Sequence, residues 1–283
     1  MRKFVALICT VFIIVCVVEA KNPKVGLVLS GGGALGFAHI GAIQALEEQG
    51  IYPTVIAGSS MGAIVGVLYA NDIKPIEMLD IIKKEKLYKK TTLLKMRPTT
   101  ETKLGIYSHV ATRQLIERVI PHNSFDSLPK KYYACVTNLE NATWEVKHTG
   151  NQLKEFVIAS AAIPGVFEAE IINGITYIDG GTLNNLPAQA IRKECDIVIG
   201  IDVIPVTYKK AQKTSDVMFQ ALRASEHQNS LEGRKLCDYL VESNAIMVYN
   251  EFDFESYLEI YRYGYTAMKT YLKNNPEMEK HCK

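Results

Sequence analysis

The chain has 283 residues, of which 48% are hydrophobic and 22% charged, and its formal net charge is +2 at pH 7. A chain of this length and composition can bury one substantial core. The nearly balanced charge, which includes Arg2 and Lys3, argues against a nucleic-acid partner.

The N-terminal residues have the pattern of a signal peptide. Met1-Arg2-Lys3 is a basic start, residues 4–18 form an apolar core, and Val18-Glu19-Ala20 ends in a small residue of the A-x-A type. The apolar run is shorter than the ~20 residues that span a bilayer, which argues against an uncleaved anchor. We therefore expect residues 1–20 to be a cleaved signal peptide. The mature chain, residues 21–283, would be periplasmic or secreted, with membrane association left open.

A glycine-rich segment, Gly31-Gly32-Gly33-Ala34-Leu35-Gly36, follows a predicted strand at residues 25–30 and opens a helix that runs to about Gln49. Three glycines at a helix start let bare backbone N–H groups converge where the helix dipole favours negative charge. The segment therefore predicts an anion site. Gly31, Gly33 and Gly36 also satisfy the dinucleotide-binding pattern, which expects an acid near the end of the next strand. An oxyanion hole expects a nucleophile there instead.

The next predicted strand, residues 54–57, leads into Gly58-Ser59-Ser60-Met61-Gly62, and an apolar helix follows at residues 63–69. No acid ends this strand, so the dinucleotide alternative lacks its ribose-binding residue. The segment has G-x-S-x-G spacing, in which Gly58 and Gly62 remove Cβ atoms that would collide in a tight strand-to-helix turn. The pattern places Ser60 at that turn, where a nucleophile is exposed.

Residues 83–96 mix lysines with apolar side chains. This stretch could rest on an anionic membrane, or it could be a solvated helix end and loop. Beyond it, the pattern predicts strands at residues 132–137 and 143–147 and a helix at residues 151–162.

Asn173-Gly174 lies between two apolar, β-branched runs and predicts a hairpin whose second strand ends at Asp179. Gly180 and Gly181 would allow a sharp departure that leaves the Asp179 carboxylate exposed. An isolated Asp-Gly-Gly is typical of an Asx-turn. The serine and glycine segments upstream favour a catalytic role for Asp179 instead.

Residues 196–203 read as a fully buried strand. Asp202 at its end is a rival for Asp179, but it lacks adjacent glycines and is interpreted as structural. No repeat or long low-complexity linker interrupts the alternation of strands and helices. The chain therefore predicts a single three-layer α/β/α domain with a mostly parallel central sheet.

The order of these motifs resembles the patatin-like phospholipase family, and similarity to its bacterial acyl hydrolases extends from about Lys24 to the C-terminus. The segments that carry the resemblance are GGGALG at residues 31–36, GSSMG at 58–62, DGG at 179–181 and the run Ala159–Phe167.

The resemblance implies that Ser60 is the nucleophile and Asp179 its base, with an oxyanion hole formed by the N–H groups of Gly31, Gly32 and Gly33. It implies a patatin-like catalytic domain over residues 21–283. The implied activity is ester hydrolysis of the phospholipase A or lysophospholipase type on a lipid or phospholipid, without metal or cofactor. The family usually has a basic residue where this chain has Leu35, which leaves the headgroup preference open.

The residues themselves also suggest which side chain could accept the Ser60 proton. Most serine hydrolases use a histidine as this base. Only His227 and His281 follow Asp179, as the Ser-Asp-His order of α/β-hydrolases requires. His227 lies in a polar helical stretch, His281 in the charged tail, and His39 is interpreted as a packing residue with one satisfied nitrogen. We therefore expect a Ser60–Asp179 dyad, with a Ser60/Asp179/His227 triad as the alternative.

Four cysteines remain after residue 20, and none forms a C-x-x-C pair, so a metal site is not expected. Cys135 and Cys195 lie in or beside predicted strands and are expected to be buried thiols.

Overall fold

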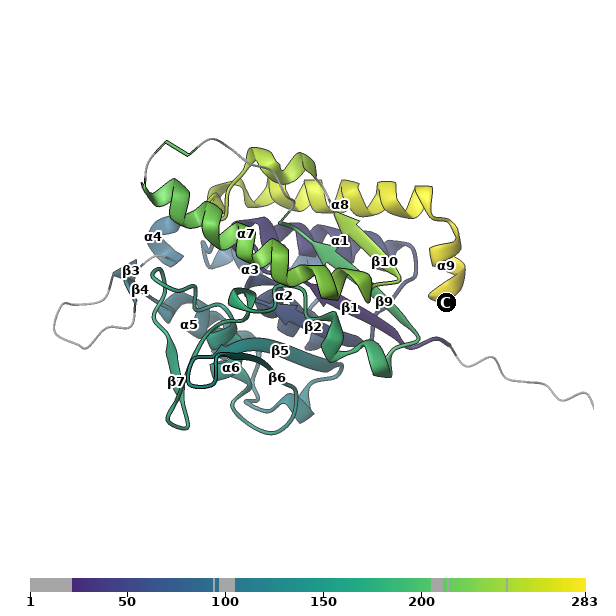
Figure 1. Ribbon diagram of the computed structural model, residues 1–283. Coiled ribbons are helices and arrows are strands. Elements are labelled where there is room, and N and C mark those ends of the chain that lie inside the picture. Colours follow the sequence, from purple (N-terminus) through teal and green to yellow (C-terminus); the bar gives the residue numbers. More distant parts are fainter. Residues whose placement is uncertain (1–21, 94, 97–104, 205–210, 213, 243) are drawn as a thin grey trace, which may run out of the picture.

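The computed structural model describes residues 22–93, 95–96, 105–204, 211–212, 214–242 and 244–283 (Figure 1). The predicted signal peptide, residues 1–20, lies outside the described residues.

The described strands form a central eight-stranded sheet of order β10-β9-β1-β2-β5-β8-β7, with β6 also paired to β5. The pairs from β10 to β5 are parallel, whereas β6, β7 and β8 pair antiparallel. This confirms the mixed α/β fold with a mostly parallel sheet. The strands are β1 (Val25–Leu29), β2 (Val55–Ser59), β5 (Lys131–Asn138), β6 (Thr143–Lys147), β7 (Glu170–Ile172), β8 (Ile175–Asp179), β9 (Ile197–Asp202) and β10 (Tyr239–Glu242), with a separate antiparallel pair, β3 (Lys95–Met96) and β4 (Tyr107–Ser108).

Successive side chains of a strand point to opposite faces of a sheet. In β1 the side chains on both faces are buried. Leu27 and Leu29 of β1 join a large core with side chains from α1, α2, α6 and α8, whereas Val28 joins a smaller cluster. Residues 186–195 and the segment after α7 complete this smaller cluster, and α7 crosses the near side of the sheet (Figure 1). The sheet therefore has a thick helical layer on one face and a thinner layer on the other.

The helices are α1 (Phe37–Glu48), α2 (Met61–Ala70), α3 (Pro75–Lys84), α4 (Lys90–Leu93), α5 (Val110–Val119), α6 (Leu153–Ser160), α7 (Thr214–Lys235), α8 (Tyr257–Asn274) and α9 (Glu277–His281). Helix α8 lies along α1 (Figure 1), and a Cβ on Gly41 or Gly264 would collide with the backbone of the other helix. These two glycines therefore permit the close packing of α1 and α8. Among the described helices, none is long and apolar enough to cross a membrane.

The sequence patterns predicted the positions of the helices and strands, but some of the predicted ends differ from those in the structure. The Asn173-Gly174 hairpin is confirmed by the antiparallel pairing of β7 with β8. The helix expected at residues 151–162 is shorter, because Gln152 adopts a left-handed conformation with φ of 71° and Asn151 pairs with Ser124. A 3-10 turn, Gly33–Gly36, precedes α1 where a continuous helix was expected.

Candidate active site

Ser60 occupies a sharp turn between β2 and α2, as the sequence predicted. Strand β2 ends at Ser59, α2 begins at Met61, and Ser60 has φ of 55° and ψ of −126°. A non-glycine residue in this conformation is strained, which is typical of a nucleophile elbow. A Cβ on Gly58 would overlap the Gly62 carbonyl, and one on Gly62 would overlap backbone of β1. The two glycines are thus required by the close approach of three backbone segments.

Strand β5 brings the serine and aspartate segments together. Its residue Cys135 pairs with Ser59 at the end of β2, and the next residue, Val136, pairs with Asp179 at the end of β8. Because β2 is parallel and β8 antiparallel to β5, their carboxyl ends converge from opposite directions. Ser60 and Asp179, 119 positions apart, therefore meet through two consecutive residues of one strand.

The Asp179 carboxylate is buried, with 2% of the residue exposed, and the expectation of an exposed carboxylate is wrong. Its Oδ1 accepts a hydrogen bond from Gly181 N at 2.7 Å. Its Oδ2 makes no hydrogen bond of regular geometry to a described residue. Burial raises the pKa of Asp179 to about 7, while the nearby Ser60 hydroxyl and the Gly181 N–H oppose the rise. A carboxylate with this pKa can accept and release a proton near neutral pH.

The turn after Asp179 packs too closely for larger residues. A Cβ on Gly180 would overlap the Cys135 carbonyl, and one on Gly181 would lie 2.7 Å from Asn185 Oδ1. The two glycines therefore let the loop turn back against β5 and enclose the carboxylate, which explains its burial.

The glycine loop lies against Ser60, since a Cβ on Gly31 would be 3.0 Å from the Ser60 Cβ. Gly31 N donates to both Oδ1 (3.1 Å) and the carbonyl oxygen (3.3 Å) of Asn185. The N–H groups of Gly32 and Gly33 have no hydrogen-bond partner among the described residues. Gly33 has φ of 53°, and Gly36 approaches Met61 too closely for a side chain. The three N–H groups are therefore not equivalent, because only that of Gly31 is already engaged.

Two further polar residues, Ser160 and Asn229, hold these segments by hydrogen bonds. Ser160 Oγ accepts from Ser60 N at 3.0 Å and donates to the Cys135 carbonyl at 2.6 Å. Asn229 of α7 accepts from Asn185 N at 2.7 Å and donates to the carbonyl of Gly181 at 2.9 Å. Ser160 lies inside the Ala159–Phe167 run that carried the family resemblance, but no sequence pattern pointed to Asn229.

The histidines are not hydrogen-bonded to the serine or the aspartate. His227 makes no such bond to Ser60 or Asp179, and its Nδ1 is buried without a partner among the described residues. His39 is fully buried, its Nε2 is 2.8 Å from the Ser30 carbonyl, and burial lowers its pKa to about 4. The interpretation of His39 as a packing residue is confirmed.

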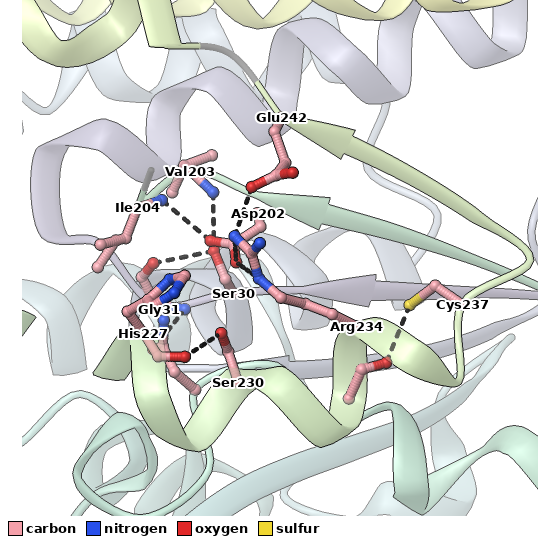
Figure 2. A network of polar contacts seen from close by, with 12 residues as sticks. Ser30, Gly31, Asp202, Val203, Ile204, His227, Ser230, Arg234, Cys237 and Glu242 are labelled. Carbon is pink, nitrogen blue, oxygen red and sulfur yellow. Dashed lines mark hydrogen bonds and ion pairs between the residues drawn. The ribbon is translucent and has the colours of Figure 1, made fainter. Parts of the chain in front are cut away.

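Asp202 belongs to a polar network with Arg234 and Glu242 (Figure 2). Its Oδ2 accepts from Nε (2.9 Å) and Nη2 (2.8 Å) of Arg234, and its Oδ1 accepts from Ile204 N at 3.0 Å. Arg234 also pairs with Glu242. Both carboxylate oxygens of Asp202 are therefore occupied, in agreement with its structural interpretation.

Ser60 faces a cavity of about 50 Å³, more than the roughly 10–15 Å³ that one water needs. Its walls are mostly apolar and include Ile163, Phe167 and Phe252. A second, almost wholly apolar cavity adjoins it and shares its walls at Met61, Ile64 and Thr112.

Within the ranges that the structure describes, no three His, Cys, Asp or Glu side chains are grouped as metal ligands. Cys135 and Cys195 are buried free thiols, as expected.

The model of the patatin-like phospholipase family matches residues 27–191, which include the glycine, serine and aspartate segments. The chain belongs to the patatin-like phospholipase family. The lysophospholipase NTE1 of Meyerozyma guilliermondii is 28% identical to this patatin-like chain over 275 residues, covering 87% of this chain and 19% of that protein. The lysophospholipase NTE1 of Saccharomyces cerevisiae is 32% identical over 189 residues, which cover 65% of this chain and 11% of that protein. The chain thus spans a fifth or less of the length of these two relatives.

Among solved structures, VipD from Legionella pneumophila is similar to this patatin-like chain with a TM-score of 0.47 and 15% sequence identity. The match covers 90% of this chain and 67% of VipD.

Proposed function

We propose that this patatin-like protein hydrolyses acyl esters of lipids, as a phospholipase A or lysophospholipase, with Ser60 as nucleophile and Asp179 as base. One observation carries the proposal. The Ser60 hydroxyl lies at a strained turn beside the buried Asp179 carboxylate, and its interaction with that carboxylate opposes the rise of the Asp179 pKa. A buried carboxylate with a raised pKa beside a serine at a strained turn supports a role in proton transfer.

In the proposed reaction, Asp179 accepts the Ser60 proton as the serine oxygen attacks the ester carbonyl. The tetrahedral intermediate collapses, the alcohol leaves with the proton from Asp179, and the acyl group stays on Ser60. A water molecule then attacks the acyl-enzyme while the same carboxylate accepts its proton, and the fatty acid is released as the Ser60 oxygen takes that proton from Asp179.

The oxyanion of the intermediate needs hydrogen-bond donors that are not already used. Gly32 and Gly33 have such N–H groups, whereas that of Gly31 donates to Asn185. We therefore assign the oxyanion hole to Gly32 and Gly33 and give Gly31 an orienting role. This narrows the set of three glycines implied by the resemblance.

Lipid substrates, export and peripheral membrane contact are parts of the same proposal. The apolar cavities beside Ser60 favour an acyl chain as ligand. Export is supported by the pattern of residues 1–20, and membrane contact by the lysine-rich end of α3 and by the exposed Val217 and Met218 at the start of α7. Mass spectrometry of the mature N-terminus would test cleavage after Ala20.

The alternatives have less support. A Ser60/Asp179/His227 triad needs His227 between the serine and the aspartate, and His227 is hydrogen-bonded to neither. A dinucleotide site at Gly31, Gly33 and Gly36 expects an acid after β2, where the chain has serine.

The test is hydrolysis of a chromogenic short-chain ester together with labelling by a fluorophosphonate, which reacts with activated serines. Wild type should hydrolyse the ester and carry the label on Ser60, as located by peptide mass spectrometry. Ser60→Ala should do neither, whereas Ser127→Ala, at an exposed serine, should match wild type. EDTA should not change the rate. Label on another serine, or activity that EDTA abolishes and calcium restores, would contradict the proposal.

A further inference from the structure

His109 is a buried histidine with an unpaired ring nitrogen. It precedes α5, only 3% of it is exposed, and its ring stacks on Phe167 with centroids 4.5 Å apart. Its Nε2 is buried and has no hydrogen-bond partner among the described residues. Burial, with a smaller effect of Arg113, lowers the pKa of His109 to about 3, so the ring is neutral near pH 7. One ring nitrogen is then a donor and the other an acceptor.

His109 lines the same cavity as Ser60. The cavity is mostly apolar, and a buried polar nitrogen in such a place is costly unless a partner satisfies it. No described residue of the protein hydrogen-bonds His109 Nε2. A polar group of a ligand that enters the cavity could therefore be its partner.

The second cavity indicates how a lipid would be oriented. It is almost wholly apolar and adjoins the first across Met61, Ile64 and Thr112. An acyl chain placed there would leave the ester at Ser60. The alcohol part of the lipid would then lie in the first cavity, where His109 is.

We propose that His109 hydrogen-bonds a free hydroxyl on the alcohol part of the substrate, next to the scissile ester, and so selects monoacyl lipids that carry this hydroxyl. The inference rests on the proposed ester hydrolysis at Ser60. A hydroxyl suits this position because it both donates and accepts, and so it pairs with Nε2 in either tautomer of the ring. An ester oxygen only accepts.

The test uses two lipids that differ in one group: 1-palmitoyl-lysophosphatidylcholine and its 2-deoxy analogue, which lacks the free hydroxyl. In mixed micelles, wild type should show a kcat/KM at least ~10-fold higher for the hydroxyl lipid, because a site that hydrogen-bonds a hydroxyl rejects the analogue without it. His109→Phe keeps an aromatic ring on Phe167 and removes both nitrogens, so this ratio should fall to near 1. His109→Gln, which restores a donor and an acceptor, should recover part of it.

His122→Phe is the matched control, because His122 is exposed, and its ratio should equal that of wild type. A wild-type ratio near 1, or a ratio that His109→Phe leaves unchanged, would overturn the inference. An equal loss on both lipids in His109→Phe would also overturn it, because that result indicates a structural or general catalytic role.

Binding separates this inference from the proposed hydrolysis. Calorimetric titration of Ser60→Ala protein with the two lipids, below their micellar concentrations, should give ~10-fold tighter binding of the hydroxyl lipid. The difference should disappear in Ser60→Ala/His109→Phe. If wild type hydrolyses neither lipid but this difference in binding is found, the hydrolysis proposal fails and the hydroxyl site stands. If both lipids are hydrolysed and bound equally, the hydroxyl site fails alone.

Discussion

Asp179 and Asp202 lie at the carboxyl ends of two strands of the same sheet and show why burial alone does not make a catalytic base. Each is 2% exposed, and burial raises the pKa of both. Asp202 has both oxygens occupied, by Arg234 and by the Ile204 N–H. Asp179 has one oxygen bound to the N–H of its own loop, and the Ser60 hydroxyl interacts with the carboxylate.

The two strands differ in what surrounds their ends. Strand β9 lies between β1 and β10 in the parallel part of the sheet, where α7 supplies Arg234. Strand β8 runs antiparallel to β5 and ends against the serine turn. The comparison therefore predicts that Asp179 serves chemistry and Asp202 serves stability.

The largest expected effect is on turnover. Asp179→Asn should lower kcat by roughly 10³ or more, because the amide cannot accept the Ser60 proton. Asp202→Asn should lower kcat by less than ~10-fold. Steady-state hydrolysis of a chromogenic ester by the two variants measures the difference. An active Asp179→Asn variant beside an inactive Asp202→Asn variant would assign the base to Asp202. A kcat of the Ser60 and Asp179 double mutant far below that of either single mutant would argue against a shared dyad.

The next effect is on folding stability. Arg234→Met should lower the free energy of unfolding by about 3 kcal/mol at pH 8, because it leaves Asp202 buried without its cation. Lys235→Met is the control, since Lys235 and Glu232 form an exposed pair, and it should cost less than ~1 kcal/mol. Urea unfolding measures both. Equal losses in the two variants would show that the Asp202 pair contributes no more than a surface pair.

The pH profile tests the burial of Asp179. A free aspartate titrates near about 3.9, but the buried one has a pKa of about 7, so kcat/KM should rise as the pH rises through this value. A histidine base would also make kcat/KM rise with pH in a similar range, so the same pH profile is needed for His227→Ala. The rise of kcat/KM through about pH 7 should persist in that variant. Its disappearance would transfer the base to His227 and favour the triad.

The smallest effect is a stability gain in an inactive variant. Because the pKa of Asp179 is raised on folding, its contribution to stability is full below about pH 4 and is lost as the pH rises through about 7. Asp179→Asn cannot ionise, so its stability relative to wild type should increase by ~1 kcal/mol or more between pH 5 and pH 8. Thermal unfolding at the two pH values measures this, and a constant difference would mean that Asp179 is not desolvated.

Predictions made from neighbouring residues located the elements and turns, although the helix expected at residues 151–162 is shorter, and those that depended on distant contacts are less complete. The turn at Ser60 and the hairpin before Asp179 were predicted because glycine, asparagine and apolar alternation act within a few residues. The burial of Asp179 was not predicted, because it depends on how the loop after β8 packs against β5. For the same reason, nothing in the glycine segment indicated that Asn185 engages Gly31.

The sequence by itself determined where Ser60 and Asp179 lie on their own turns and that the sheet is mostly parallel, because backbone sterics and hydrophobic periodicity are local properties. Only the tertiary structure decided that these two residues meet across β5 and that His109 lines the cavity beside Ser60. It also decided that Asp179 titrates near neutral pH and that Asp202 is paired. Desolvation and hydrogen bonding depend on which side chains surround a group, and those neighbours come from segments far apart in the chain.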